Sequence, residues 1–232
     1  MTPANTSPAG RGEVHALLSA TFNGLVDAFG RAGERSGRID RWIDLDGHPL
    51  KLSVAGTRLA EALAPALAHL PVPGGEPSVE LEILAWDEAE SGIAPPSLPW
   101  SWAELSGTVR LVLPPGGEAF RIHAYEEGMM FFMYSVEARR AVFWTRDTRQ
   151  LPSFFRAAPF LTLMHWWGRE TGLRLVHAGC VGDERGAALI AGKGGSGKST
   201  TCLLCIEAGM DYLSDDFCLI RPLPEPTVIS LY

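Results

Sequence analysis

Residues 188–220 read ALIAGKGGSGKSTTCLLCIEAGMDYLSDDFCLI, and this stretch decides the fold of the C-terminal part of the chain. An apolar segment leads into a glycine-rich loop, which leads into a segment with helical spacing that Gly209 is expected to end. A second short strand then runs into two adjacent acids, Asp215 and Asp216. This order of strand, loop, helix and strand predicts an α/β unit whose loop binds phosphate.

The loop at residues 192–199 matches the phosphate-binding pattern G-x-x-x-x-G-K-[ST] at every fixed position. Glycines allow consecutive backbone N–H groups to point at one anion, and the helix that follows adds the positive end of its dipole. Lys198 is then expected to contact the β- and γ-phosphates, and the Ser199 hydroxyl to hold Mg²⁺. We therefore expect ATP and Mg²⁺ as cofactors, bound by Gly192, Lys193, Gly194, Gly195, Ser196, Gly197, Lys198, Ser199 and Thr200.

The two acids end a strand at the edge where ligands of such sheets bind. Because neighbouring residues of a strand point to opposite sides, we expect only one of the two carboxylates to face the γ-phosphate. The alternative is that Asp215 and Asp216 only cap a turn. His177, in the segment VHAG, lies one strand, turn and strand ahead of the loop. It is either a neighbour of the site or a strand histidine without a catalytic role.

Residues 173–220, about a fifth of the chain, resemble the bacterial HPr serine kinase family in the order and spacing of four features. These are His177, the glycine-rich loop, the Gly209 helix stop and the paired acids. The resemblance implies an ATP-dependent kinase that phosphorylates a protein or peptide hydroxyl. It also implies Asp216 as the proton acceptor, Asp215 as a supporting acid near the metal or lysine, and catalytic roles for Lys198 and His177.

A complete kinase of this family has further sheet, a second metal carboxylate and a basic residue beyond the paired acids. Only 33 residues follow Ser199, and Glu225 is the last carboxylate among them. We therefore expect a kinase core that is incomplete at the C-terminus and leaves apolar surface exposed on its last sheet. Whether this form is active is left open.

Two other functions remain open. A nucleotide-binding module without catalysis would need the loop but not the acids. A ParA/MinD-type ATPase is also compatible with the segment KGGSGKS, in which Lys193 would reach into a partner subunit of a homo-oligomer. The spacing disfavours it, because its loop normally lies near the N-terminus and the acids follow a longer helix.

The N-terminal region predicts an α+β domain with an antiparallel sheet over residues 13–172, after a disordered tail at residues 1–12. Helical spacing at residues 13–29 should end at Gly30 and Gly33. Asp46-Gly47 predicts a hairpin, and residues 57–70 a helix that Pro65 kinks or breaks. Residues 78–87 read as a strand, residues 108–145 as an antiparallel run of strands, and residues 152–172 as helical. An incomplete P-loop domain at residues 173–232 completes an α/β protein.

Composition limits the partners. The net charge of −7 and the scattered arginines exclude a broad nucleic-acid surface. The N-terminus lacks the pattern of a signal peptide, and no apolar run is long enough to span a bilayer. We therefore expect a cytoplasmic protein that does not bind membranes, with Cys180, Cys202, Cys205 and Cys218 as reduced thiols. Cys202 and Cys205 form a CxxC, but within a helix they read as core residues.

Overall fold

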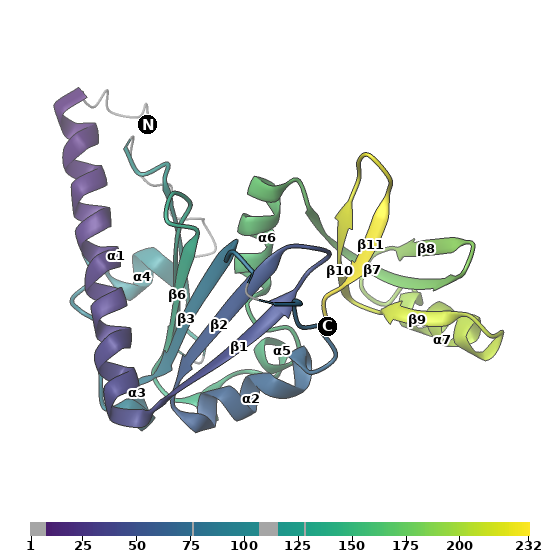
Figure 1. Ribbon diagram of the computed structural model, residues 1–232, viewed down its shortest axis with the longest axis horizontal. Coiled ribbons are helices and arrows are strands. Elements are labelled where there is room, and N and C mark those ends of the chain that lie inside the picture. The colour runs from purple at the N-terminus through teal and green to yellow at the C-terminus, as the bar shows by residue number, and fades with distance from the viewer. Residues whose placement is uncertain (1–7, 76, 107–115, 128) are drawn as a thin grey trace. The chain divides into compact units, whose positions relative to one another are not determined.

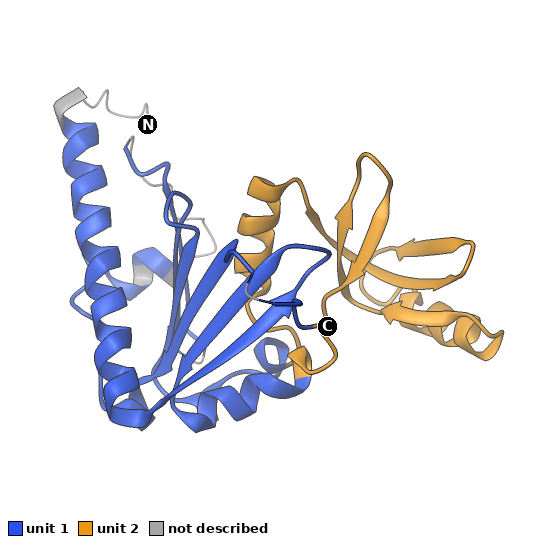
Figure 2. Ribbon diagram, in the orientation of Figure 1, with its two compact units in different colours: residues 1–65, 72–156 blue, residues 66–71, 157–232 orange. Residues whose placement is uncertain are grey.

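The computed structural model describes residues 8–75, 77–106, 116–127 and 129–232, which form an α/β fold of helices and mixed sheets (Figure 1). The chain divides into two compact units, residues 1–65 with 72–156 and residues 66–71 with 157–232 (Figure 2). The division falls before the predicted boundary at residue 172, because the helix at residues 161–171 packs against the first strand of the second unit.

The first unit is built on one six-stranded sheet. Its elements, in chain order, are α1 (Pro8–Ser36), β1 (Arg38–Asp44), β2 (Pro49–Ala55), α2 (Thr57–Leu67), β3 (Leu81–Asp87), α3 (Glu88–Ser91), α4 (Trp102–Ser106), β4 (Phe120–Tyr125), β5 (Met130–Ser135), β6 (Arg140–Thr145), η1 (Thr148–Gln150) and α5 (Ser153–Ala157). The strand order across the sheet is β1-β2-β3-β6-β5-β4.

This sheet is mixed, so the expectation of an antiparallel sheet is only partly right. Strands β4, β5 and β6 form the predicted antiparallel run, and β1 and β2 form the predicted hairpin. The pairs β2–β3 and β3–β6, however, are parallel. The helix between β2 and β3 carries the chain back to its starting edge, which makes a parallel pair possible. Residues 108–114, predicted as a strand, lie outside the described residues.

The hairpin turn follows from its two central residues. Asp46 has φ 57° and Gly47 has φ 84°, so both lie in the left-handed region that a tight two-residue hairpin requires. The backbone N–H groups of Leu45 and His48 donate to each other's carbonyl oxygens at 3.1 and 3.2 Å. Asp–Gly supplies this conformation at low cost, which is why the sequence predicted the turn correctly.

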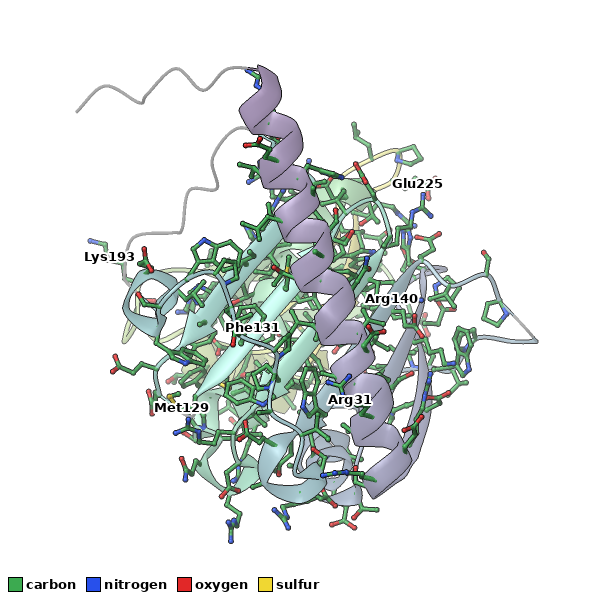
Figure 3. All side chains as sticks on the ribbon, turned by 90° about the vertical axis from the view of Figure 1, so that its left-hand side faces the viewer. Arg31, Met129, Phe131, Arg140, Lys193 and Glu225 are labelled. Carbon is green, nitrogen blue, oxygen red and sulfur yellow. The ribbon has the colours of Figure 1, made fainter. Side chains whose placement is uncertain are left out.

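Helix α1 covers one face of the six-stranded sheet (Figure 3). Its predicted apolar face is confirmed, since Leu18, Leu25 and Phe29 are buried and belong to a core with Trp86 and Trp144 of the sheet. On the opposite face, strands β5 and β6 meet α5, where the Phe143 and Phe155 rings stack with centroids 5.0 Å apart. Both faces of the central strands are therefore buried.

The predicted ends of the first helix are wrong. Residues 8–12, expected in a disordered tail, belong to α1, while residues 1–7 lie outside the described residues. The helix also continues past Gly30 and Gly33 and ends at Ser36, before Gly37 with φ 79°. A glycine inside a helix costs about 1 kcal/mol relative to alanine, and the burial of Ala28, Phe29 and Ala32 around Gly30 offsets this cost.

The second unit contains α6 (Leu161–Thr171), β7 (Arg174–Asp183), β8 (Gly186–Ala191), α7 (Lys198–Glu207), β9 (Asp211–Ser214), β10 (Phe217–Arg221) and β11 (Thr227–Ser230). Strand β7 is central: β8 pairs with one of its edges, and β9 and β10 pair in succession with the other. Strand β11 continues the sheet beside β10. Because β8 and β9 are both antiparallel to β7, they run in the same direction with β7 between them.

Helix α7 lies against β7, β8 and β9. Every element predicted between residues 173 and 214 is present at its expected place. Among the described residues, the helices are too short or too polar to cross a membrane.

Candidate phosphate-binding site

The glycine-rich loop joins the end of β8 to the start of α7, as the sequence predicts. It runs from Gly192 to Gly197, and all six of these residues are exposed. Gly195 has φ 75° and Gly197, the residue that precedes the helix, has φ 90°. Both values lie in the region that favours glycine, so a side chain at either position would strain the loop. The loop is thus exposed to solvent at a helix N-terminus, a position at which proteins commonly bind phosphate.

The loop is closed by contacts within itself. The Ser196 N–H donates to the Lys193 carbonyl oxygen at 3.1 Å. The Lys198 ammonium donates to the carbonyl oxygens of Gly192 at 3.0 Å and of Lys193 at 3.4 Å. A Cβ atom at Gly192 would lie 2.4 Å from the Ser196 Oγ, so a side chain at the first position of the motif would require the Ser196 hydroxyl to move. Lys198 is therefore held over the loop, where a phosphate would also be bound.

A second glycine brings α7 close to the sheet. A Cβ atom at Gly179 of β7 would lie 2.4 Å from the Cys202 Sγ. Cys202 is buried, and burial and, second, the charge of Asp215 raise the pKa of its thiol. The interpretation of Cys202 as a core residue is confirmed, whereas Cys205 is only half-buried. All four cysteines are free thiols.

The strand register brings the loop and the acids to the same edge. On β7, Ala178 pairs with Ala191, the last residue before the loop, and Cys180 pairs with Ser214, the last residue before the acids. Neighbouring strands lie about 4.8 Å apart, so the ends of β8 and β9 are about 10 Å apart across β7. A phosphate chain bound at the loop would thus extend toward Asp215 and Asp216.

The two acids lie in a bend between β9 and β10 rather than within a strand. The Ser214 hydroxyl donates to the Phe217 carbonyl oxygen at 2.8 Å and holds the two ends of the bend together. The alternation of side chains along a strand therefore does not set the directions of Asp215 and Asp216, contrary to our expectation. In this bend the two carboxylates contact different side chains.

Asp216 pairs with His177. The His177 Nε2 lies 2.6 Å from the Asp216 Oδ1, and both side chains are more than half exposed. His177 stands opposite Phe217 in the register of β7 and β10, and the two rings stack with centroids 4.8 Å apart. The structure thus brings His177, which the sequence left between two interpretations, into direct contact with an acid of the site.

Asp215 has a different partner. The Tyr212 hydroxyl donates to the Asp215 Oδ1 at 3.4 Å. Three further residues of the site, which bracket the two acids in the segment YLSDDF, were not predicted: Tyr212, Ser214 and Phe217. The serine before the acids was the available signal, because serine hydroxyls commonly bond to nearby backbone in turns.

The residues expected to hold Mg²⁺ are Ser199, in the first turn of α7, and Asp215. Among the described residues, no group of three histidine, cysteine, aspartate or glutamate side chains is placed to hold a metal ion. Mg²⁺ that binds with a nucleotide keeps several waters and needs only one or two protein oxygens. A hydroxyl and a carboxylate are oxygen donors of the kind this ion prefers, so the residues fit that mode of binding.

Comparison with known proteins yields no family model that matches the sequence and no matching curated protein.

Proposed function

We propose that this protein is an ATP-dependent kinase of the HPr serine kinase type, which transfers the γ-phosphate to a hydroxyl of a protein or peptide. The observation that carries the proposal is the meeting of three features at one sheet edge. These are the loop at residues 192–199, the acidic bend, and the 2.6 Å contact between His177 and Asp216. A simple phosphate-binding loop requires only the first of them.

Each side chain has a defined task in this proposal. The loop N–H groups and Lys198 bind the phosphates and neutralise their charge. Asp216 accepts the proton of the attacking hydroxyl, while His177 keeps the carboxylate oriented. The acceptor oxygen forms a bond to the γ-phosphorus, the bond from that phosphorus to the bridging oxygen breaks, and ADP leaves with the electron pair. Bound Mg²⁺, held by Ser199 and Asp215, would supply further charge neutralisation at the phosphates.

A second candidate is an ATP-binding module that regulates partners without transferring phosphate. The openness of the site favours it, since residues 192–197 and both acids are exposed. Kinases exclude water from the reacting phosphate, and exposed groups exclude it poorly. This candidate predicts ATP binding without transfer to any acceptor.

The test combines two measurements on the same samples. ATP binding is titrated calorimetrically in Mg²⁺, and labelled phosphate is followed from ATP to serine-containing peptides and proteins. Lys198→Ala serves as the control that removes the phosphate lysine. Transfer that depends on Lys198 supports the kinase, whereas tight ATP binding without transfer supports the regulatory module. Absence of ATP binding overturns both.

The kinase proposal also places the protein in the cytoplasm, where ATP is available and thiols stay reduced. Its partners would be the nucleotide and a polypeptide acceptor. A homo-oligomer that uses Lys193 belongs to the less favoured ParA/MinD-type ATPase.

A further inference from the structure

Tyr212 reaches Asp215 because of an irregularity in strand β9. In a regular strand, side chains three positions apart point to opposite faces of the sheet. Opposite β9, however, Val181 pairs with Tyr212 and the adjacent Cys180 pairs with Ser214, so Leu213 is an extra residue. Such a bulge shifts the alternation by one position. The bulge and the bend that follows it together bring the Tyr212 hydroxyl to within 3.4 Å of the Asp215 Oδ1.

Packing around the bulge agrees with this shift. The Leu213 Cδ1 lies 3.2 Å from the position that a Cβ would take at Gly182, on the face away from Gly179. Beside Gly179 lie both the carbonyl oxygen of Asp215 and the Sγ of Cys202. The backbone of Asp215 therefore lies on the side of the sheet that α7 covers.

That side also carries Ser199. Ser199 and Cys202 lie three residues apart on α7, so they share one face of the helix. Tyr212, Asp215 and the start of α7 thus belong to one local arrangement.

We propose that Tyr212 is a positioning residue, whose hydroxyl holds the Asp215 carboxylate toward the face of α7 that carries Ser199. This inference rests on the proposed function, because it assigns Tyr212 to the Mg²⁺–ATP site of that kinase. Tyr212 contributes no metal ligand and accepts no proton in the reaction. It would restrict the Asp215 carboxylate so that, together with Ser199, it would hold Mg²⁺ when the nucleotide is bound.

The test compares Tyr212→Phe with the wild type and with Tyr125→Phe, a control on β4 of the first unit. ATP binding is titrated at a series of Mg²⁺ concentrations. Tyr212→Phe is expected to raise the Mg²⁺ concentration for half-maximal ATP binding roughly 2–10-fold, the effect of one lost hydrogen bond. ATP affinity at saturating Mg²⁺ should be unchanged, and Tyr125→Phe should behave like the wild type.

The effect of Tyr212→Phe on the Mg²⁺ dependence should also require the Asp215 carboxylate. In an Asp215→Asn background, Tyr212→Phe should leave the Mg²⁺ dependence unchanged. An equal Mg²⁺ dependence of wild type and Tyr212→Phe overturns the inference, and so does an effect that persists without the carboxylate.

Urea unfolding of the same variants separates this inference from the proposed function. If the wild type binds no ATP, the proposed function fails. The double variant Tyr212→Phe/Asp215→Asn is compared with the two single variants. If the changes in unfolding free energy of the single variants add up to that of the double variant, the Tyr212–Asp215 contact is absent and the Tyr212 inference fails alone.

Discussion

Strands β5 and β8 have six residues each and are rich in apolar side chains, yet their environments differ completely. Every residue of β5 is buried, whereas in β8 five residues are exposed and Ile190 is half-buried. Strand β5 lies between β4 and β6, and both faces of the sheet are covered there. Strand β8, in contrast, lies at the end of its sheet and pairs with one described strand, β7.

The same contrast holds for the helices of the two units. Helix α1 buries an apolar face, but α7 buries only Cys202 and leaves Leu203, Leu204 and Ile206 exposed. The expectation of apolar surface exposed on the last sheet is met at Leu189 of β8, whereas the other three exposed apolar residues belong to helix α7. Burial is thus set by neighbours rather than by composition, and the most open part of the molecule is the part that carries the candidate site.

The largest expected effect concerns the chemistry of the open unit. Asp216→Asn should lower phosphoryl transfer about 10²–10⁴-fold, the usual contribution of a general base. ATP affinity should be retained, because the loop amides and Lys198 supply it. Labelled-phosphate transfer and ATP titration measure the two effects on the same sample. Transfer at the wild-type rate would show that Asp216 is not the base.

Asp215→Asn is the matched variant of the adjacent acid. It should also lower transfer, but through weaker metal binding, so added Mg²⁺ should partly restore the rate. If added Mg²⁺ restored the transfer rate of Asp216→Asn instead, Asp216 would be the metal-binding acid and Asp215 the base.

The next effect compares the two strand environments directly. Phe143→Ala, in the buried sheet of the first unit, should destabilise the protein by about 3–5 kcal/mol. Leu189→Ala in β8, where the side chain is 41% exposed, should change stability by less than about 0.5 kcal/mol. Urea unfolding measures both. Similar losses would mean that β8 is covered in solution, and the contrast between the units would disappear.

Within the loop, Lys198 and Lys193 should differ. Lys198→Ala should weaken ATP binding roughly 10–100-fold, since it removes charge-assisted hydrogen bonds to phosphate. Lys193→Ala should change binding less than about 2-fold, because charged groups exposed to water interact weakly. ATP titration distinguishes them. Equal losses together with ATP-dependent dimerisation would favour the ParA/MinD-type ATPase.

The smallest effect is a pH dependence of the first unit. Asp147 caps η1, and hydrogen bonds from the Arg149 side chain hold its pKa at about 2, below the ordinary 3.8. Because the folded-state pKa is lowered, this stabilisation is present above about pH 4 and is lost as the pH falls toward 2. Asp147→Asn should reduce the difference in unfolding free energy between pH 6 and pH 3. An unchanged difference would show that Asp147 does not contribute to the pH dependence of stability.

Local signals in the sequence were sufficient for much of the fold. The glycine-rich loop, the hairpin at Asp46-Gly47 and the strands and helix around residues 173–214 depend on contacts between near neighbours in the chain. The ends of α1 and the parallel pairs of the first sheet were not predictable in this way. They depend on which apolar faces meet, and residues far apart in the chain decide that.

The candidate site divides along the same line. The sequence alone predicted a candidate phosphate-binding loop with Lys198 and Ser199, because that motif depends on consecutive backbone groups and one helix terminus. Only the tertiary structure brought the acids and the loop to the same end of the sheet, since this requires β8 and β9 to run in the same direction on the two sides of β7. It alone paired Asp216 with His177 and Asp215 with Tyr212, because a bend and a bulge, rather than strand alternation, direct those side chains.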